Sequence, residues 1–306
     1  MSKRKAATFG QDIMRGEWGG ANMSGLLKMS DFNAKYMYNK KDYMRGGQID
    51  VDLIKQEHTE TSGTSIFDPV LCELLYRWFC PPGGIVLDPF AGGSVRGIVA
   101  SRLGRQYIGV ELRKEQVEAN RQQEDVACDH VPVWHCGDSR SIDKICEGVE
   151  ADFVFSCPPY VDLEVYSDDP QDISTMKYPE FIKAYSEIIT KSCGLLKNDR
   201  FACFVVGEVR NSKGGYYGFV PDTINAFISA GLSYYNEAIL VTAVGSLPIR
   251  CGRSFESSRK LGKTHQNVLI FCKGNPKKAT TDIGAVEYEI NIDDEGGVIP
   301  TTALHE

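Results

Sequence analysis

Four short segments of the sequence combine residue types that could take part in chemistry. They are the loop Asp88-Pro89-Phe90-Ala91-Gly92-Gly93-Ser94, the acid Glu111, the pair Asp138-Ser139, and the corner Phe155-Ser156-Cys157-Pro158-Pro159-Tyr160. Each directly follows a short apolar run that predicts a strand. Ligands of open parallel sheets bind beyond the carboxyl ends of the strands. The sequence therefore predicts that these segments lie together at one edge of a sheet.

The glycines of the 88–94 loop would let the backbone approach a ligand, and the following helix offers unpaired N–H groups at its start. The loop is not G-x-G-x-x-G, so a dinucleotide is not the first choice. No Lys-Ser/Thr follows it, so it is not a P-loop. Taken alone, it is equally typical of a plain strand-to-helix turn.

Two acids at neighbouring strand ends favour a nucleoside ligand. Glu111 lies 23 residues after Asp88 (111 − 88), where a carboxylate can accept hydrogen bonds from a ribose diol. Asp138 could accept from the exocyclic amine of an adenine. The structural alternatives are a solvated strand-end charge for Glu111 and a helix N-cap for Asp138. Together the three strand ends carry the polar groups that a nucleoside cofactor requires.

An alternation of strands and helices must position these segments. It predicts an α/β fold with a mainly parallel sheet. The expected strands are 85–87, 106–110, 131–134, 153–155, 201–206, 237–242 and 267–272. The expected helices are 69–79, 94–103, 113–124, 178–196 and 221–230.

Composition sets the outer limits. The 306 residues are 42% hydrophobic and 25% charged, with a net charge of −7, which argues against general coating of nucleic acid but not against a local basic patch. None of the ten cysteines forms a C-x-x-C pair, so no metal site is predicted. No signal peptide and no apolar run near the roughly 18 residues of a membrane span are found. A reducing cytoplasm and no membrane contact are expected.

Three regions are expected: an N-terminal extension over 1–60, a catalytic domain over 61–274, and an acidic C-terminal tail over 275–306, packed on the surface or mobile.

The sequence resembles the class I S-adenosylmethionine-dependent DNA amino-methyltransferases, which methylate adenine N6 or cytosine N4. The resemblance lies in Thr64-Ser65-Ile66-Phe67-Asp68-Pro69, the 88–94 loop, Gly109-Val110-Glu111 and Cys157-Pro158-Pro159-Tyr160. It implies a Rossmann-like, seven-stranded, mostly parallel sheet whose last strand is antiparallel. It also implies S-adenosyl-L-methionine as cofactor, bound by Thr64, Phe67, Asp88, Phe90, Ala91, Gly92, Gly93, Ser94, Glu111, Asp138 and Ser139.

In such an enzyme the Pro-Pro-Tyr corner would carry the catalytic residues Cys157, Pro158, Pro159 and Tyr160. A base amine is a poor nucleophile, so hydrogen-bond acceptors and alignment with the methyl group must activate it. The Pro158 carbonyl is one rigid acceptor, and the residue before it is the second. Tyr160 can stack on a base taken out of the duplex. The structural alternative is a proline-closed strand end with a core tyrosine.

Cys157 departs from the Asp, Asn or Ser that the family places before the two prolines. It could stand in for Ser, act as a thiolate acceptor, or be a nucleophile toward a pyrimidine ring. The nucleophile is the weakest of the three, because enzymes that methylate carbon place their Cys after a proline. Cys157 is similar to Ser in size, which slightly favours cytosine N4 over adenine N6 as the methylated position.

A basic stretch over 246–264 is the predicted contact to DNA phosphates. Its charge is +4 (5 − 1), since Glu256 opposes Arg250, Arg253, Arg259, Lys260 and Lys263. Interleaved Gly and Ser predict a mobile loop, and a merely solvated loop is the alternative. Residues 208–211 and 161–178, with Asp162 and Glu164, are expected to rim the same cleft. No separate recognition domain is visible, so recognition falls to the extension, these loops, or a partner chain such as a second copy in a homodimer.

The sequence thus predicts methyl transfer to an exocyclic amine of a flipped DNA base, without metal or covalent enzyme intermediate. The alternatives are an RNA amino-methyltransferase, a C5-pyrimidine methyltransferase that uses Cys157, and a non-catalytic relative that binds nucleic acid.

Overall fold

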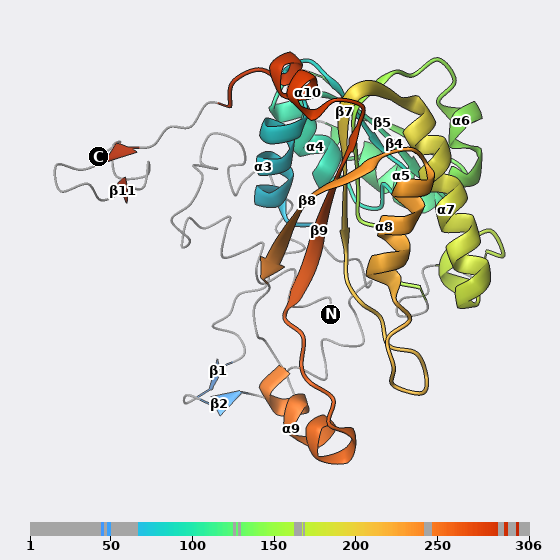
Figure 1. The fold of residues 1–306 in the computed structure, drawn as a ribbon, viewed down its shortest axis with the longest axis vertical. Coiled ribbons are helices and arrows are strands. Elements are labelled where there is room, and N and C mark those ends of the chain that lie inside the picture. Colours follow the sequence, from blue (N-terminus) through green and yellow to red (C-terminus); the bar gives the residue numbers. More distant parts are fainter. Residues whose placement is uncertain are drawn as a thin grey trace. The chain divides into compact units, whose positions relative to one another are not determined.

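All seven predicted strands are present, and they form one twisted sheet (Figure 1). The protein is seen here in a computed structural model. It describes residues 67–124, 127, 130–161, 167, 169–241 and 247–286. It also describes four short strands: β1 (Met44–Arg45), β2 (Gln48–Ile49), β10 (Asn291–Ile292) and β11 (Val298–Ile299). Within these residues, no helix combines the length and apolar character that a membrane span needs.

The strand order across the sheet is β5-β4-β3-β6-β7-β9-β8. The strands are β3 (Ile85–Asp88), β4 (Gln106–Glu111), β5 (Val133–Cys136), β6 (Ala151–Ser156), β7 (Leu196–Val206), β8 (Ser233–Val241) and β9 (His265–Lys273). The first five are mutually parallel, and β9 runs antiparallel to both β7 and β8. The predicted antiparallel last strand is therefore confirmed.

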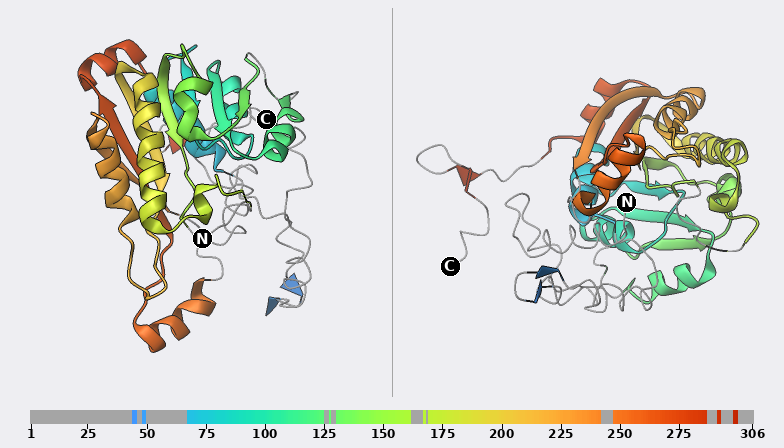
Figure 2. Two further views of the ribbon diagram at one scale, coloured as in Figure 1. Left: turned by 90° about the vertical axis from the view of Figure 1, so that its right-hand side faces the viewer. Right: turned by 90° about the horizontal axis from the view of Figure 1, so that it is seen from below.

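Helices cover both faces of this sheet (Figure 1 and Figure 2). They are α3 (Pro69–Phe79), α4 (Val95–Arg102), α5 (Lys114–Arg121), α6 (Ile142–Ile145), α7 (Tyr178–Leu195), α8 (Phe219–Ser229) and α10 (Pro276–Ile283), with short 3₁₀ turns at Ser139–Ser141 and Ile173–Thr175. On one face, the Tyr76 ring of α3 meets the edges of Phe153 and Phe155. On the other, Phe227 of α8 stacks on Phe271 of β9 at 4.0 Å. Successive side chains of a strand point to opposite faces, so the buried apolar runs of the central strands supply both layers.

Two boundaries differ from the sequence prediction for identifiable reasons. Strand β5 begins at Val133 rather than Val131, because Pro132 has no N–H to donate to a ladder. Helix α8 begins at Phe219 rather than Pro221. The carboxylate of Glu208 accepts hydrogen bonds from the backbone N–H groups of Phe219 and Val220 and so extends the helix by two residues.

The chain divides into two compact units. One consists of residues 71–241 and 265–288 and contains the sheet with its helices. The other unit contains 1–70, 242–264 and 289–306, including helix α9 (Leu247–Ser258). The prediction of a loop over the basic stretch is therefore wrong for these twelve residues. Glycine and serine disfavour helix by up to about 1 kcal/mol each, so their presence in this stretch predicted a loop.

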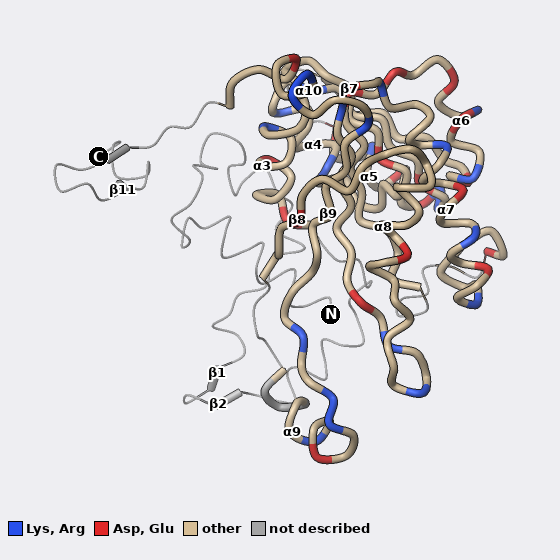
Figure 3. The backbone as a smooth tube through the Cα atoms, in the orientation of Figure 1, with Lys and Arg blue, Asp and Glu red and all other residues tan. Residues whose placement is uncertain are grey.

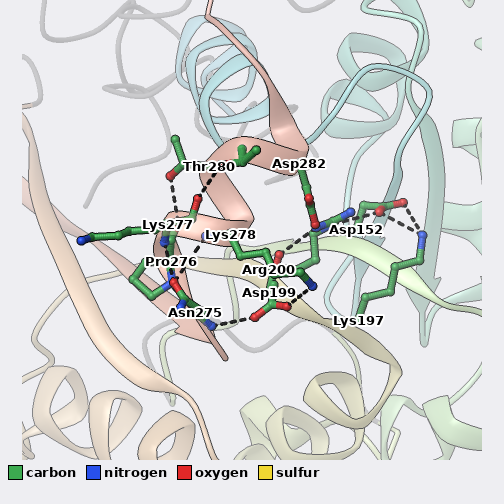
Figure 4. A network of polar contacts seen from close by, with 11 residues as sticks. Asp152, Lys197, Asp199, Arg200, Asn275, Pro276, Lys277, Lys278, Thr280 and Asp282 are labelled. Atoms are coloured by element: carbon green, nitrogen blue, oxygen red, sulfur yellow. Dashed lines mark hydrogen bonds and ion pairs between the residues drawn. The ribbon is translucent and has the colours of Figure 1, made fainter.

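A polar network closes the end of the sheet where β6 begins, opposite the Cys157 corner (Figure 4). Buried Asp152 accepts from Lys197 Nζ at 2.9 Å, Arg200 Nε at 3.1 Å and the Ile85 N–H at 3.0 Å. Arg200 continues to Asp282 of α10 at 3.0 Å. The first residues of the predicted tail thus form a helix tied to the sheet.

This network predicts a pH-dependent contribution to stability. Burial alone would raise the pKa of Asp152, but the Ile85 N–H, Lys197 and Arg200 lower it below its ordinary value. A carboxyl whose pKa is lower in the folded state stabilises the fold at pH values above its unfolded-state pKa, near 3.9. This stabilisation is lost as the pH falls through the pKa of the folded state. We expect Asp152→Asn to lower the unfolding free energy by about 1–3 kcal/mol near pH 7 and the deficit to shrink below about pH 4.

Urea unfolding followed by circular dichroism across this pH range measures the deficit. Asp282→Asn, at a side chain 37% exposed, should cost less. A deficit for Asp152→Asn that stays constant from pH 7 to pH 3 would contradict the claim that the ionised Asp152 carboxylate stabilises the fold.

Candidate functional site

Asp88, the last residue of β3, lies at the centre of the site. Its side chain is fully buried and its two carboxylate oxygens are occupied by neighbours. Arg96 Nε lies 2.6 Å from Oδ2, Tyr107 OH donates to Oδ2 at 2.8 Å, and Ser156 Oγ donates to Oδ1 at 2.5 Å. The Phe90 N–H also donates to Oδ1 at 3.0 Å. Asp88 therefore contributes to the site by holding the loop from inside.

Arg96 of α4 also holds this loop through hydrogen bonds. Its guanidinium donates to the carbonyls of Phe90 at 2.6 Å and Ala91 at 2.9 Å, in addition to its pair with Asp88. Burial alone would lower the pKa of Arg96, but the charge of Asp88 raises it above its ordinary value. The sequence prediction missed Arg96. The available signal was an arginine within the mainly apolar stretch 95–100, since arginine is rarely buried without a partner.

The glycine turn of the loop is connected to β4 and α5. Gly92 adopts φ +51°, the left-handed region that glycine tolerates best. Its N–H donates to Glu111 Oε2 at 3.0 Å, and its carbonyl accepts from Asn120 Nδ2 at 2.7 Å. Ser94 Oγ donates to Gln123 at 2.7 Å. The predicted neighbourhood of the loop and Glu111 is thus present in the structure.

Glu111 is a mostly buried carboxylate at the carboxyl end of β4. Its side chain is 13% exposed, and Oε1 accepts from the Arg113 N–H at 2.9 Å. Burial raises the pKa of Glu111, while the hydrogen bonds from Arg113 and Gly92 oppose this rise. The result is a mostly buried carboxylate beside a glycine turn.

Asp138 and Ser139 have separate tasks after β5. Asp138 caps the 3₁₀ turn by accepting from the Arg140 N–H at 2.9 Å, and it pairs with the Arg140 guanidinium at 2.6 Å. The N-cap alternative is therefore what the structure has, and a contact of Asp138 to an adenine stays a prediction. Ser139 Oγ donates to the Pro89 carbonyl at 2.5 Å and fixes the loop from a third strand end.

The Pro-Pro-Tyr corner follows β6 directly. Pro158 is buried, whereas Cys157 and Tyr160 are partly exposed. The Tyr160 hydroxyl accepts a short hydrogen bond from Gln266 Nε2 of β9, a residue that the sequence prediction missed. The Tyr160 ring meets Phe219 edge-on, with centroids 6.3 Å apart. The ring is therefore held from two sides.

Val161 turns the chain sharply after the corner. It is β-branched, 1% exposed, and has φ +52°, a conformation that such residues rarely adopt. Strain of this kind costs on the order of 1–3 kcal/mol and persists where the surrounding packing over-determines it. Burial of Val161 in the apolar core offsets the cost, so the direction in which Tyr160 leaves the strand is set by the core.

The structure does not place the remaining predicted residues relative to this site. Thr64, Asp162 and Glu164 lie outside the described residues, and Phe67 is partly buried ahead of α3. The basic residues of 246–264 belong to the other compact unit. Their contact to DNA stays a prediction. Among the residues that the structure describes, no group of three His, Cys, Asp or Glu side chains is arranged to hold a metal ion.

Comparison with known proteins finds a sequence family to which part of the chain is similar. The model of the N6/N4 DNA methylase family matches residues 22–122, about a third of the chain. A DNA adenine methyltransferase of Escherichia coli K12, YhdJ, is 48% identical over 46 residues, which cover 15% of this chain and 16% of that protein. The predicted family resemblance is confirmed.

Two further similarities are more limited. The type II methyltransferase M2.DpnII of Streptococcus pneumoniae is 44% identical over 41 residues, 13% of this chain and 15% of that protein. The matched stretches thus span about a sixth of these curated relatives. Among solved structures, TrmN from Thermus thermophilus superposes with a TM-score of 0.45 at 14% identity, over 67% of this chain and 48% of that one.

Proposed function

We propose, from the premise that the chain is a relative of the DNA amino-methyltransferases, that it transfers methyl from S-adenosylmethionine to an exocyclic amine of a DNA base. One observation carries this proposal. Ser156 Oγ donates to Asp88 Oδ1 at 2.5 Å, so the glycine-rich loop and the Pro-Pro-Tyr corner are joined through a single buried carboxylate. A donor bound at the loop and a base held at the corner would be neighbours.

The residues at the loop fit the cofactor. Glu111 is a mostly buried acceptor next to the left-handed turn at Gly92, as a ribose diol beside a closely approaching backbone requires. When bound, S-adenosylmethionine supplies an electrophilic methyl group on a sulfonium sulfur. Asp88, Arg96 and Asn120 hold the loop that receives it.

The corner supplies orientation and acceptors for the amine. The Pro158 carbonyl is rigid and has no competing N–H of its own residue, so it can accept from one amine N–H. The Tyr160 ring supports the base by stacking. The amine nitrogen would accept the methyl group that the bound donor supplies, with the donor's carbon–sulfur bond breaking, and would then release one proton to solvent. Most of the rate gain is orientation, because the chain only has to align two reactants.

The target base is adenine N6 or cytosine N4. The relative YhdJ is named as an adenine enzyme, which favours N6, whereas the Ser-like size of Cys157 favours N4. The decisive experiment incubates duplex DNA, tRNA and rRNA with enzyme and cofactor, digests them to nucleosides, and identifies the methylated one by mass. A product methylated only at pyrimidine C5, or methylation of RNA alone, would overturn the proposal.

Glu111 should control cofactor affinity. Glu111→Ala removes an acceptor for two ligand hydroxyls and one partner of Gly92, and we expect it to weaken S-adenosylmethionine binding by about 10- to 100-fold. Isothermal titration calorimetry measures this change. Glu115→Ala, an exposed acid on α5, is the matched control and should bind normally. Equal affinity of the two variants would remove Glu111 from the cofactor site.

Cys157→Ser separates the proposed roles of the thiol. If Cys157 is a small residue with a weak acceptor, the variant should keep methyl transfer within about tenfold of wild type, because a hydroxyl offers a similar acceptor. Single-turnover rates measure the effect. Complete loss of methyl transfer with normal cofactor affinity would instead indicate that Cys157 acts as a thiolate.

A further inference from the structure

The loop that joins β7 to α8 is a built hairpin of residues 207–218 (Figure 1). Arg210 and Tyr216 form an antiparallel bridge, and the Tyr217 N–H donates to the Val209 carbonyl at 2.9 Å. At the turn, Asn211 Oδ1 accepts from the N–H groups of Lys213 and Gly215. These contacts give the 207–218 hairpin a defined shape without a ligand.

Both ends of this hairpin lie close to the Tyr160 ring. At one end, a Cβ added to Gly207 would lie 3.4 Å from Tyr160 Cε1. At the other end, the Phe219 ring meets Tyr160 edge-on. Buried Val209 anchors the base of the hairpin, and Glu208 is engaged by the start of α8. The hairpin therefore begins and ends beside the residue that would support the methylated base.

The outer part of the hairpin presents cations and an aromatic ring. The Arg210 guanidinium lies 4.1 Å from the centroid of the Tyr216 ring, and this tyrosine is 48% exposed. Lys213 is exposed at the turn. Figure 3 shows the basic positions along the hairpin. Glu208, the only acid of this segment, is used by α8, so the outer part is basic on a chain of net charge −7.

We propose that the 207–218 hairpin binds the nucleic-acid strand that flanks the base held at the corner. Tyr216 would stack on a neighbouring base, as aromatic side chains do with unpaired bases, and Lys213 and Arg210 would contact phosphates. Arg210 over the Tyr216 ring keeps that ring in place before the strand arrives. This inference rests on the proposed function and adds an element that contacts the substrate beside the reacting base.

The test measures binding of fluorescein-labelled duplex and single-stranded DNA by anisotropy. Tyr216→Ala is expected to weaken single-strand binding about tenfold, and Tyr216→Phe to bind like wild type, because stacking needs only the ring. Lys213→Ala should make the negative slope of log affinity against log salt for duplex DNA less steep by about 0.9. Tyr235→Ala on β8 and Lys277→Ala on α10 are matched controls that change exposed residues elsewhere and should bind normally.

Methylated nucleosides are measured for the same proteins. If wild type methylates DNA while Tyr216→Ala and Lys213→Ala match the controls in Kd, salt slope and KM, the hairpin inference is overturned and the proposed function stands. If wild type methylates no nucleic acid but the two variants still lose DNA binding, the proposed function fails and the hairpin remains a binding surface. Loss of S-adenosylmethionine affinity in Tyr216→Ala would also count against the inference, because it would indicate damage to the whole site.

Discussion

Asp88→Ala is expected to lower the free energy of unfolding by about 3–5 kcal/mol, because it leaves the buried Arg96 charge without its partner. That loss is a large part of the roughly 5–15 kcal/mol that stabilises a typical domain. The variant also removes the acceptor of Ser156 Oγ and one of the two acceptors of the Phe90 N–H. We therefore expect cofactor binding to be lost with the stability. Urea unfolding and calorimetric titration measure the two effects.

Two comparisons test the cause. Glu118→Ala breaks the exposed pair with Lys114 and should change stability by no more than about 0.5 kcal/mol. The double variant Asp88→Leu with Arg96→Met removes both charges and should recover much of the loss, because well-packed apolar residues can replace a buried pair. A loss below about 1 kcal/mol for Asp88→Ala, or no recovery in the double variant, would contradict a central role for the pair.

Tyr160→Ala is expected to lower kcat/KM for DNA by about 10- to 100-fold while cofactor affinity stays unchanged. Base–aromatic stacking contributes roughly 1–3 kcal/mol, and the Tyr160 ring is the aromatic surface that the corner offers. Its position is set by Phe219 and by the hydrogen bond from Gln266. Steady-state methyl transfer at several DNA concentrations measures kcat/KM, and cofactor titration measures the cofactor affinity.

Tyr160→Phe is the matched variant, since it keeps the ring and removes only the acceptor for Gln266 Nε2. It should retain most of the activity, with a loss confined to about tenfold, the range of one hydrogen bond. If Tyr160→Phe is as inactive as Tyr160→Ala, the hydroxyl and not the ring carries the effect. If both are fully active, the corner is only a proline-closed strand end.

The strands and the main helices could be predicted from local patterns. The apolar runs before Asp88, Glu111 and Cys157 each became a strand of the sheet, and the first two ends meet at the glycine turn. This worked because the alternation of strands and helices dictates which ends share an edge. The helix α9 was missed, since its glycine and serine content argues for a loop and only the folded chain decides otherwise.

The residues that hold the site could not be found from spacing. Arg96, Tyr107 and Gln266 lie 8, 19 and 106 positions from the partners they contact, and each contact exists only after the sheet has formed. Asp138 caps the 3₁₀ turn by accepting from the Arg140 N–H, and its contact to an adenine stays a prediction.

Local sequence was sufficient for the order of elements, the strand-end acids and the Pro-Pro-Tyr corner, because these depend on periodicity and on the chemistry of single residues. Tertiary packing alone decided that Asp88 faces inward, that Ser156 of β6 donates to it, and that the two ends of a hairpin lie beside Tyr160. The physical reason is that burial and long-range hydrogen bonds determine where a side chain points, and neither is encoded within a short segment.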